Sequence, residues 1–506
     1  MFLSSCTSTL LATVVGLLGV FYLWARWKLS YWQRRGVPTL PTSLIFGNFK
    51  DSILMKVSPG YLLGRLYSEA DDDAPFLGVY IMHNPFLLLR SPEIMKQIFV
   101  KDFNAFSDRY FAAPQSSYDP IGSQGLFSIK NPEWRYLRTK LSPAFTSGKL
   151  KNLFGLMLES AESLNAFVDQ RFKGVGDASV AIEFKDTSTR YTTDVISSLA
   201  FGIRTNSFEN PPPEFYKNSR HPFEMTILRA VRLFATFFFP TISKYLGSSM
   251  LGDVTDYFRQ VFWSSMNSRE ASKRERGDVI DSLLKLKNEK PEDGFEVQGD
   301  MLVAQSVIFF VAGLETSSTT MAFTLWELAK HPEIQDRVRR DIIDNLDDGK
   351  ALTYESIQKM KYVMAAINET LRLYPPAPII DRVANRDYKI PGTQIVLEKG
   401  TVVYAALPGI HMDPKYHPEP ELYDPDRFSD ERKNDIKPCT FMPFGEGPRI
   451  CIGLRVGMLQ TAVGLITILR DHEVSINPKY NNSISKRSVF VTPENGITLN
   501  VRKISA

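Results

Sequence analysis

The sequence is poor in cysteine, has no marked excess of either charge, and contains no repeat or low-complexity tract. Its 506 residues include three cysteines, Cys6, Cys439 and Cys451. So small an odd number cannot build a disulfide framework, and it indicates a reducing compartment. The 60 Lys and Arg against 56 Asp and Glu leave a net charge of +4, which gives no sign of nucleic-acid binding. The chain has 43% hydrophobic and 23% charged residues, and this composition excludes a disordered chain and a polytopic membrane protein.

One long hydrophobic run is present, at the N-terminus. Residues 2–25 carry no charged side chain, and at ~1.5 Å per residue they can cross a ~30 Å hydrocarbon core. The run lacks the basic start and the small-residue cleavage site of a signal peptide. Basic residues follow it and none precedes it: Arg26, Lys28, Arg34 and Arg35. We therefore expect an uncleaved transmembrane anchor over 2–25, with the remaining chain on the cytoplasmic side.

Behind the anchor we expect a basic, proline-containing linker over 26–43 and a single domain over 44–506. Helical spacing dominates after residue 130, in the segments Trp134–Leu141, Met301–Lys330, Glu333–Asn345 and Lys361–Tyr374. Strand-like segments are short and paired by turns, Gly78–Met82 with Phe86–Leu89 and Gln394–Leu397 with Val402–Ala405. The predicted fold class is mainly α with a minor β region.

The longest helical segment is weak at its centre. From Ala312 to Thr320 it contains glycine, serine and threonine, which lower helix propensity. One interpretation is a distortion that opens towards a ligand, where Gly313 lets something approach the backbone and Thr316 offers a hydroxyl. The other is a packed helix whose Ser and Thr hydroxyls bond back to the preceding turn. The sequence alone leaves both open.

Cys451 stands just before an apolar helical run, in a segment rich in glycine. A helix N-terminus favours the thiolate over the thiol, and the neighbouring glycines let a flat ligand approach the backbone. A nucleophilic role would need a base, but the six histidines form no local signature. A dinucleotide fingerprint fails because Ile450 occupies the third glycine position. A lone soft ligand to haem iron needs no further cysteine, and Arg449 could pair with a propionate. A buried residue in a turn would explain Cys451 but not the surrounding spacing.

The pattern Phe444-x-x-Gly447-x-Arg449-x-Cys451-x-Gly453 resembles the haem-binding loop of the cytochrome P-450 monooxygenases. The other motifs of that family follow in order: Trp134-x-x-x-Arg138 resembles the haem-propionate helix, Ala312-Gly-x-Glu-Thr316 the oxygen-binding groove, Glu369-x-x-Arg372 the buried ion pair, and Pro425-Asp-Arg427-Phe428 the meander. The anchor is similar to that of the microsomal class. The segments Leu141–Lys149 and Ala312–Ser318 most resemble the branch that oxidises drugs and plant toxins, including insect detoxification members.

Elementary geometry agrees with two of these motifs. Glu369 and Arg372, three residues apart, face one side of a helix, and Arg427 could complete a charge cluster that makes their burial tolerable. Trp134 and Arg138, four residues apart, share a helical face and suit donors to a propionate. The resemblance adds two weaker propionate candidates, Arg109 and Arg382.

The resemblance implies haem b (iron protoporphyrin IX), with Cys451 as the axial ligand of the iron. It also implies a monooxygenase of the endoplasmic reticulum membrane that uses O2 and NADPH-derived electrons. Substrates would be apolar small molecules: xenobiotics, plant toxins, insecticides, steroids or fatty acids. Thr316, with Glu315 behind it, would deliver protons, and Gly313 would leave room for O2. Two alternatives remain open, a haem-thiolate isomerase or dehydratase of lipid peroxides and a non-catalytic haem carrier or sensor.

No flavin or nicotinamide motif is present, so electrons must come from another protein. The resemblance implies NADPH–cytochrome P-450 reductase, with cytochrome b5 as a second candidate, alongside membrane lipid and a lipophilic substrate as partners. We expect a basic docking patch of residues flanking the haem-contacting segments: Arg135, Lys140, Lys149, Lys151, Lys437 and Arg455. Substrate choice is expected to lie in four loops, Phe106–Phe127, Phe223–Ile242, Ala377–Asp381 and Ser488–Val491.

Overall fold

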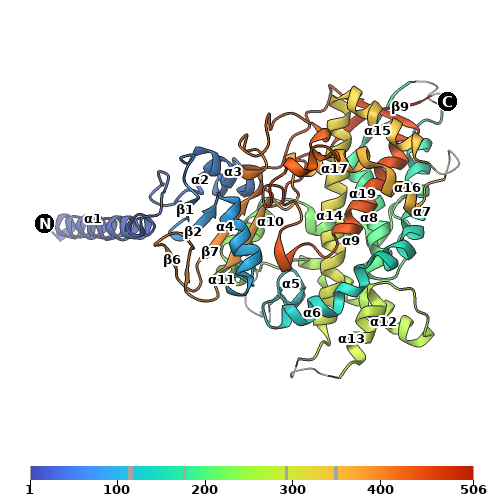
Figure 1. The fold of residues 1–506 in the computed structure, drawn as a ribbon. Coiled ribbons are helices and arrows are strands. Elements are labelled where there is room, and N and C mark those ends of the chain that lie inside the picture. Colours follow the sequence, from blue (N-terminus) through green and yellow to red (C-terminus); the bar gives the residue numbers. More distant parts are fainter. Residues whose placement is uncertain (1, 112–117, 175–177, 291–294, 347–350, 505–506) are drawn as a thin grey trace.

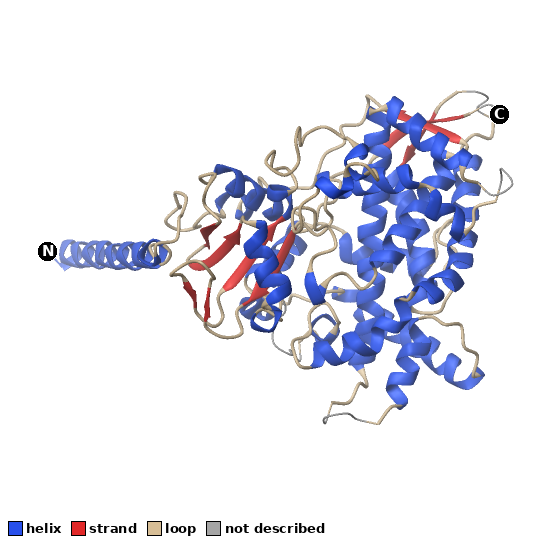
Figure 2. Cartoon of the chain, viewed as in Figure 1, coloured by secondary structure: helices blue, strands red, loops and turns tan. Residues whose placement is uncertain are grey.

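The computed structural model describes residues 2–111, 118–174, 178–290, 295–346 and 351–504, with only the backbone described for 2–8, 147 and 152. A single helix projects from a lobe that contains most of the strands, and a larger helical body adjoins that lobe (Figures 1 and 2). The predicted fold class, mainly α with a minor β region, is confirmed. The helices are α1 (Phe2–Leu29), α2 (Lys50–Ile53), α3 (Pro59–Glu69), α4 (Pro92–Lys96), α5 (Pro120–Gln124), α6 (Glu133–Leu141), α7 (Ser147–Gln170), α8 (Phe184–Ala200), α9 (Glu214–Arg220), α10 (Ile227–Phe238), α11 (Pro240–Ser243), α12 (Thr255–Ser272), α13 (Val279–Asn288), α14 (Asp300–Lys330), α15 (Pro332–Asp344), α16 (Tyr354–Lys359), α17 (Lys361–Leu373), α18 (Leu407–Ile410) and α19 (Leu454–Leu469).

The strands form three small sheets. They are β1 (Phe76–Ile81), β2 (Asn84–Leu89), β3 (Val180–Glu183), β4 (Ile379–Val383), β5 (Tyr388–Lys389), β6 (Val396–Leu397), β7 (Val402–Ala406), β8 (His472–Ile476) and β9 (Thr498–Lys503). The sheet orders are β1-β2-β7-β4, β3-β9-β8 and β5-β6. The predicted hairpin of β1 and β2 is present, with Gly78 opposite Leu87.

The second predicted hairpin is wrong. β6 pairs with β5, whereas β7 runs parallel to β2 and antiparallel to β4 in the larger sheet. Every residue of β7 is buried, but Val396 of β6 is exposed. A continuous apolar run is typical of a central strand covered on both faces, so β7 is drawn into the sheet interior and not onto its sequence neighbour.

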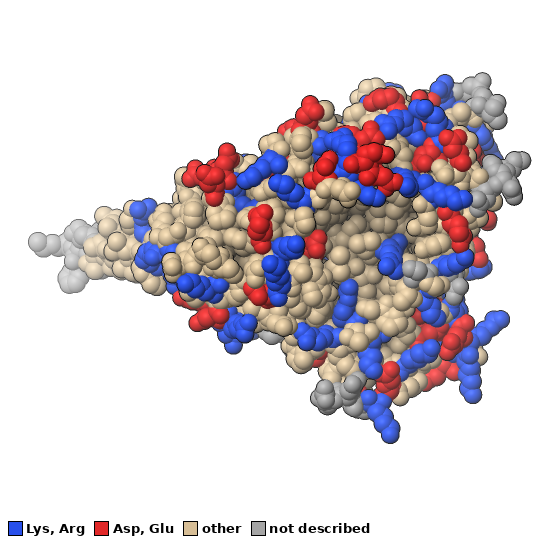
Figure 3. Space-filling view, viewed as in Figure 1, with Lys and Arg blue, Asp and Glu red and all other residues tan. Residues whose placement is uncertain are grey.

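The N-terminal helix α1 is long and apolar enough to cross a membrane. Its described side chains from Leu10 to Leu23 are exposed, and basic residues gather where it meets the body (Figure 3). α14 is also long and apolar enough to cross a membrane, but 56% of its most apolar stretch is buried inside the fold. It is therefore the central core helix of the body, packed against α8, α17 and α19.

The segment expected to be a linker is folded onto the strand-rich lobe. α1 continues to Leu29, and the Trp32 side chain is completely buried. A Cβ atom on Gly78 of β1 would lie 2.4 Å from Cγ of Trp32, so only glycine permits this contact. The Trp32 N–H donates to the Tyr80 hydroxyl at 2.9 Å, and Arg35 pairs with Glu398 at 2.5 Å. α1 is thus joined to the strand-rich lobe by a packed contact.

Candidate active site

The loop before α19 holds Cys451 in a fixed backbone path. The Cys451 N–H donates to the Phe444 carbonyl at 2.9 Å, and α19 begins three residues later with Gly453 at its N-cap. Gly445 and Gly447 have φ angles of 78° and 72°, in the left-handed region that favours glycine. A Cβ on Gly447 would come within 2.0 Å of the Phe99 carbonyl oxygen. These glycines therefore set the path that the sequence pattern indicated.

The Cys451 side chain is accessible to solvent, yet the surrounding protein raises its pKa by burial. The Gly453 N–H and the positive charges of Arg138 and Arg109 act in the opposite direction and lower that pKa. An accessible thiol near cations and a helix N-terminus is suited to binding a metal cation as the thiolate.

Three arginines gather beside this loop. The Arg449 guanidinium donates to the carbonyls of Ser107 at 2.6 Å and Ile129 at 3.1 Å. Arg382 donates to the carbonyl of Asp381 at 2.7 Å, and Arg109 pairs with the Asp381 carboxylate at 3.2 Å. Repulsion from the neighbouring guanidinium groups adds to the effect of burial in lowering the pKa values of Arg382 and Arg449.

This arginine cluster has unused donors. Nε and Nη2 of Arg382, Nη1 of Arg449 and Nε of Arg109 are buried without a hydrogen-bond partner in the described part of the chain. Burial first, and then the neighbouring guanidinium groups, lower the pKa of Arg382 to about 9 and that of Arg449 to about 8. Buried, unsatisfied cations are costly unless an anion joins them. The cluster fits a ligand with carboxylates, as the two propionates of haem b would supply.

The predicted propionate helix, α6, contributes to the same region. Trp134 is buried, and its ring lies 4.3 Å from the guanidinium carbon of Arg449. Burial lowers the pKa of Arg138, and its charge interacts with Cys451. Phe444 is half-buried in the cysteine loop. The structure therefore brings Trp134, Arg138, Phe444 and the arginine cluster together around Cys451.

The centre of α14 contains an accessible position. Ala312 is exposed although most of this core helix is buried, and the Thr316 hydroxyl donates to the Ala312 carbonyl at 2.7 Å. The next two carbonyls also receive side-chain donors, Gly313 from Gln460 at 3.0 Å and Leu314 from Thr192 at 3.2 Å. Thr316 therefore bonds back to the preceding turn, in a helix whose successive carbonyls are drawn towards side chains.

Two residues of this segment contact other parts of the chain. The open side of the Gly313 Cα faces Ile196 of α8, because a Cβ there would lie 2.7 Å from its Cδ1. Gly313 thus permits close packing of α14 on α8, and its role in leaving room for O2 stays a prediction. The Glu315 carboxylate is turned to Lys185 at 2.9 Å and Thr492 at 3.1 Å, and no hydrogen bond of the described structure joins it to the Thr316 hydroxyl.

Gln460 was missed in the sequence. It lies on α19, nine residues after Cys451, is fully buried, and donates to both Gly313 and Ser317 of α14. A lone amide in the otherwise apolar run Val456–Leu469 was the available signal. It links the helix that follows the cysteine loop to the weak centre of α14.

Comparison with known proteins agrees with this geometry. The family model for cytochrome P450 matches residues 62–501, and thus includes the cysteine loop, α6 and α14. The chain belongs to the cytochrome P450 family. It is 41% identical to cytochrome P450 6k1 of Blattella germanica, over 98% of this chain and 97% of the relative. It is 37% identical to the probable cytochrome P450 6g2 of Drosophila melanogaster, over 97% and 98% of the two chains. This P450 is accordingly a haem-thiolate monooxygenase of insect type.

The P450's buried charge cluster holds three segments together. Both Glu369 oxygens accept from Arg372, at 2.7 and 2.8 Å, and Arg427 lies 3.3 Å from the same carboxylate. Arg372 also donates to the carbonyls of His411 and Leu422. Because every group is hydrogen-bonded, burial of these charges is tolerable. The cluster pins α17 to the segment that leads to the cysteine loop.

His411 and His417 are hydrogen-bonding groups in this segment. His411 accepts from the Met442 N–H at 3.0 Å, so its other ring nitrogen carries the proton that it donates to Arg372. His417 donates to the Thr440 carbonyl at 3.0 Å. Burial lowers the pKa of His411 far below its usual range and that of His417 to about 4.

The stability of this P450 is expected to fall as the pH drops from about 6.5 to about 4. An unfolded histidine takes up a proton near pH 6.5, whereas folded His417 stays neutral down to about 4. The unfolded state therefore binds more protons in this window, and His417 contributes roughly 3 kcal/mol to the loss. Denaturant unfolding at a series of pH values measures this slope. His417→Gln should reduce it, whereas the exposed His221→Gln should not; equal slopes in the two variants would contradict the assignment.

Aromatic side chains connect three of the loops expected to choose the substrate. Phe111 stacks on Phe237 of α10 at 4.1 Å and lies 5.1 Å from Phe127, and Phe237 lies 5.5 Å from Phe490. Arg109 covers the Phe127 ring at 4.1 Å, which joins this aromatic cluster to the arginine cluster. Residues 112–117 of the first loop lie outside the described residues.

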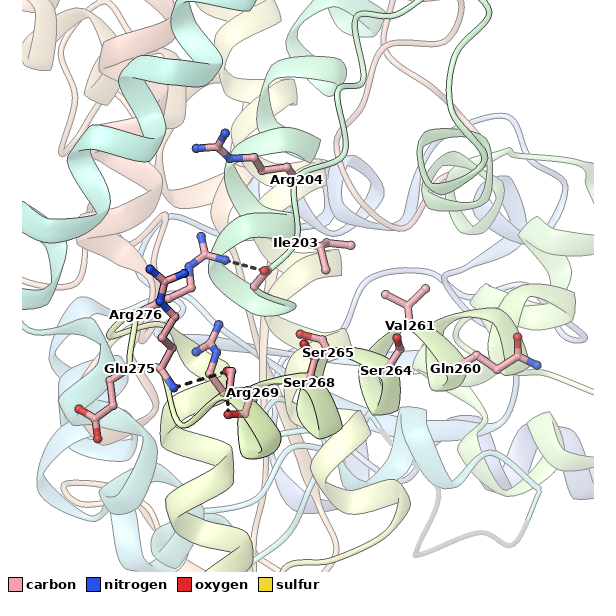
Figure 4. A pocket seen from close by; sticks show the side chains of 13 residues that line it. Ile203, Arg204, Gln260, Val261, Ser264, Ser265, Ser268, Arg269, Glu275 and Arg276 are labelled. Atoms are coloured by element: carbon pink, nitrogen blue, oxygen red, sulfur yellow. Dashed lines mark hydrogen bonds between the residues drawn. The ribbon is translucent and has the colours of Figure 1, made fainter.

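The surface hollow shown in Figure 4 is separate from this site. It has a volume of about 1120 Å³ and lies between α12 and the end of α8, lined by Arg204, Arg269, Arg276 and a row of serines. Arg269 is bound by Asp278 and Asp281, and Arg276 donates to the Gly202 carbonyl. Since these cations already have partners, the hollow offers little attraction to an anion.

Proposed function

We propose that this P450 is a microsomal monooxygenase, anchored by α1 in the endoplasmic reticulum membrane with its domain in the cytosol. It would use haem b, O2 and electrons from NADPH to oxidise apolar small molecules, in keeping with the xenobiotics of the detoxification branch. The observation that supports this most is the pairing of an internal thiol with three arginines that retain unused donors. The thiol offers a soft anionic ligand for iron, and the arginines offer cations for two carboxylates.

When bound, haem b supplies the activation of O2, with thiolate donation from Cys451 favouring O–O cleavage. The protein sets access, polarity and orientation. We propose that the Thr316 hydroxyl passes protons into the space beside Ala312. Its bond to the Ala312 carbonyl fixes the oxygen in place while leaving its lone pairs free to accept from water.

Thr316→Ala is expected to keep haem binding but to lower the product formed per NADPH at least several-fold. Without the hydroxyl, protons are not delivered at the required position, and the reducing equivalents are lost as hydrogen peroxide. The measurement is product, peroxide and NADPH in a reductase-coupled assay. Thr320→Ala is the matched control, because that hydroxyl makes the same back-bond one turn further on. An unchanged ratio in Thr316→Ala would remove the role proposed for this hydroxyl.

We propose NADPH–cytochrome P450 reductase as the electron donor, with cytochrome b5 as a second candidate. The basic residues expected to form its docking patch are partly engaged: Lys140 pairs with Glu289 at 2.6 Å and Lys151 with Glu355 at 2.5 Å. Arg135 and Lys437 are exposed, and neither forms an ion pair among the described residues. A groove of about 610 Å³ lined by Phe444, Leu454 and Met458 lies on the cysteine loop. We therefore place most of the electrostatic attraction on Arg135 and Lys437.

Arg135→Glu with Lys437→Glu is expected to slow reduction by the reductase about ten-fold at low salt. Charge complementarity raises the encounter rate more than the affinity, and salt weakens it. Stopped-flow reduction under carbon monoxide measures the rate, while peroxide-driven turnover should stay unchanged. Lys479→Glu with Lys486→Glu gives the same change of charge in the C-terminal region. Equal slowing in both double variants would place the docking surface elsewhere.

The same assay separates the two alternative functions. A peroxide isomerase or dehydratase would turn over without reductase, and a haem carrier would consume no NADPH. Substrate-stimulated NADPH consumption supports the monooxygenase. We further propose that the aromatic cluster covers the substrate, because its rings join the pocket loops to the haem-side arginines. A mass-spectrometric screen of lipophilic compounds would identify that substrate.

A further inference from the structure

A polar cluster joins α14 to α8 and contains groups that have no part in the proposed mechanism. Lys185, at the start of α8, contacts Glu315 of α14 at 2.9 Å, with only 15% and 13% of the two side chains exposed. The lysine also donates to Ser318 at 2.9 Å. When one partner of so poorly solvated an ion pair is removed, the other charge is left buried and unpaired. Each of the two residues therefore holds the other in place.

The second oxygen of Glu315 reaches a third part of the chain. The Thr492 hydroxyl donates to it at 3.1 Å and the Thr319 hydroxyl at 3.3 Å. Thr492 belongs to the C-terminal loop, so the carboxylate joins α8, α14 and this loop. A carboxylate that accepts from a lysine and two hydroxyls is held in one orientation.

The loop held in this way carries Phe490, two residues before Thr492. Further bonds of this loop include the Val491 N–H to the Pro376 carbonyl at 3.0 Å, the Ser485 N–H to the Thr492 carbonyl at 2.8 Å and the Glu494 N–H to the Ser483 carbonyl at 2.8 Å. None of these three reaches α14, whereas the Thr492 hydroxyl bonds to Glu315 of that helix. Phe490 then meets Phe237 of the aromatic cluster at 5.5 Å.

We propose that Lys185 and Thr492 are positioning residues that act through Glu315 to hold Phe490 in the aromatic cluster. Lys185 aligns the Glu315 carboxylate, which binds Thr492, and the loop then places the ring over the substrate space. The proposal rests on the function proposed above, since it deepens the role of that cluster. It also assigns Glu315 to positioning, in place of the proton delivery that its place beside Thr316 suggested.

Two azoles of different size test this assignment, because both ligate haem iron and the proposal predicts that only the larger one contacts the aromatic cluster. The probes are 4-phenylimidazole and clotrimazole, titrated by difference spectroscopy on the full-length holoenzyme. Thr492→Val, which keeps the ion pair, should weaken clotrimazole about five-fold, the effect of one hydrogen bond, and leave 4-phenylimidazole unchanged. The folded Lys185→Met variant should also bind clotrimazole more weakly and 4-phenylimidazole unchanged. Lys185→Arg should retain tight binding of clotrimazole. Thr393→Val, in the turn between β5 and β6, is the matched control.

A double variant distinguishes positioning from general loosening. In a Phe490→Ala background, Thr492→Val should have no further effect on clotrimazole, because the ring that it positions is absent. Equal loss in both backgrounds, or equal weakening of both azoles, would overturn the proposal. So would unchanged clotrimazole binding in Thr492→Val. Absence of the thiolate-type carbon-monoxide band from the native protein would instead contradict the proposed function, so the two failures are distinguishable.

Discussion

Cys451→Ala is expected to abolish the thiolate-type absorption band of the reduced carbon-monoxide complex, and monooxygenase activity with it. Neither alanine nor serine supplies a soft anion to iron. The loop itself should survive, because its path depends on Gly445, Gly447 and the Cys451 N–H, which alanine retains. Haem would then remain partly held by the arginine cluster, with an altered spectrum.

Cys439→Ala is the matched control for that experiment. Cys439 is buried, and burial raises the pKa of its thiol to about 12, so it stays protonated and cannot act as a thiolate ligand. The band should be retained in this variant. A thiolate-type band in Cys451→Ala would refute the assignment of the iron ligand.

Glu369→Ala is expected to destabilise the protein by about 3–5 kcal/mol, a large share of the ~5–15 kcal/mol that holds a typical domain folded. Arg372 is completely buried and Arg427 nearly so, and both would lose their counter-charge. Expression should yield little haem-loaded protein. The haem content of purified protein and its denaturant midpoint measure the effect.

Asp426→Ala provides the comparison, one residue from Arg427. Its ion pair with Arg337 at 2.7 Å has 44% and 39% of the side chains exposed. A solvated pair contributes about 0–1 kcal/mol, so this variant should fold and bind haem normally. Similar losses in the two variants would mean that burial of the charge is not the cause.

Local sequence spacing predicted the parts of the site that depend on one short segment. The cysteine loop could be predicted from the sequence because its glycines, Phe444 and Arg449 lie within ten residues of one another. The Glu369–Arg372 pair follows from the helical period alone. The cluster of Arg109, Arg382 and Arg449 required the family resemblance, since they come from three distant segments and only the folded chain reveals their unused donors.

Contacts between distant segments explain what the sequence could not predict. The contact of Gly313 with Ile196, more than a hundred residues earlier, could not be predicted from the spacing of residues within α14. Neighbours on a helix point in different directions, so the partners of Glu315 could not be inferred from its place beside Thr316. The pairing of β7 was predicted wrongly, because turn residues do not indicate a parallel partner more than three hundred residues away. Each of these features depends on a choice among tertiary partners.

The burial of Trp32 against Gly78 sets where the chain can be shortened to obtain a protein free of membrane. Removal of residues 2–20 would keep the buried residues Ala25, Leu29, Trp32 and Val37, and also the contacts of Phe21 and Trp24 with His83. A cut at residue 44, the domain boundary that the sequence predicted, would remove the Trp32 indole from β1 and expose apolar surface that invites aggregation. The same contact fixes the direction of α1 relative to the strand-rich lobe, so the membrane insertion that we propose for α1 would also decide which face of the domain meets the lipid.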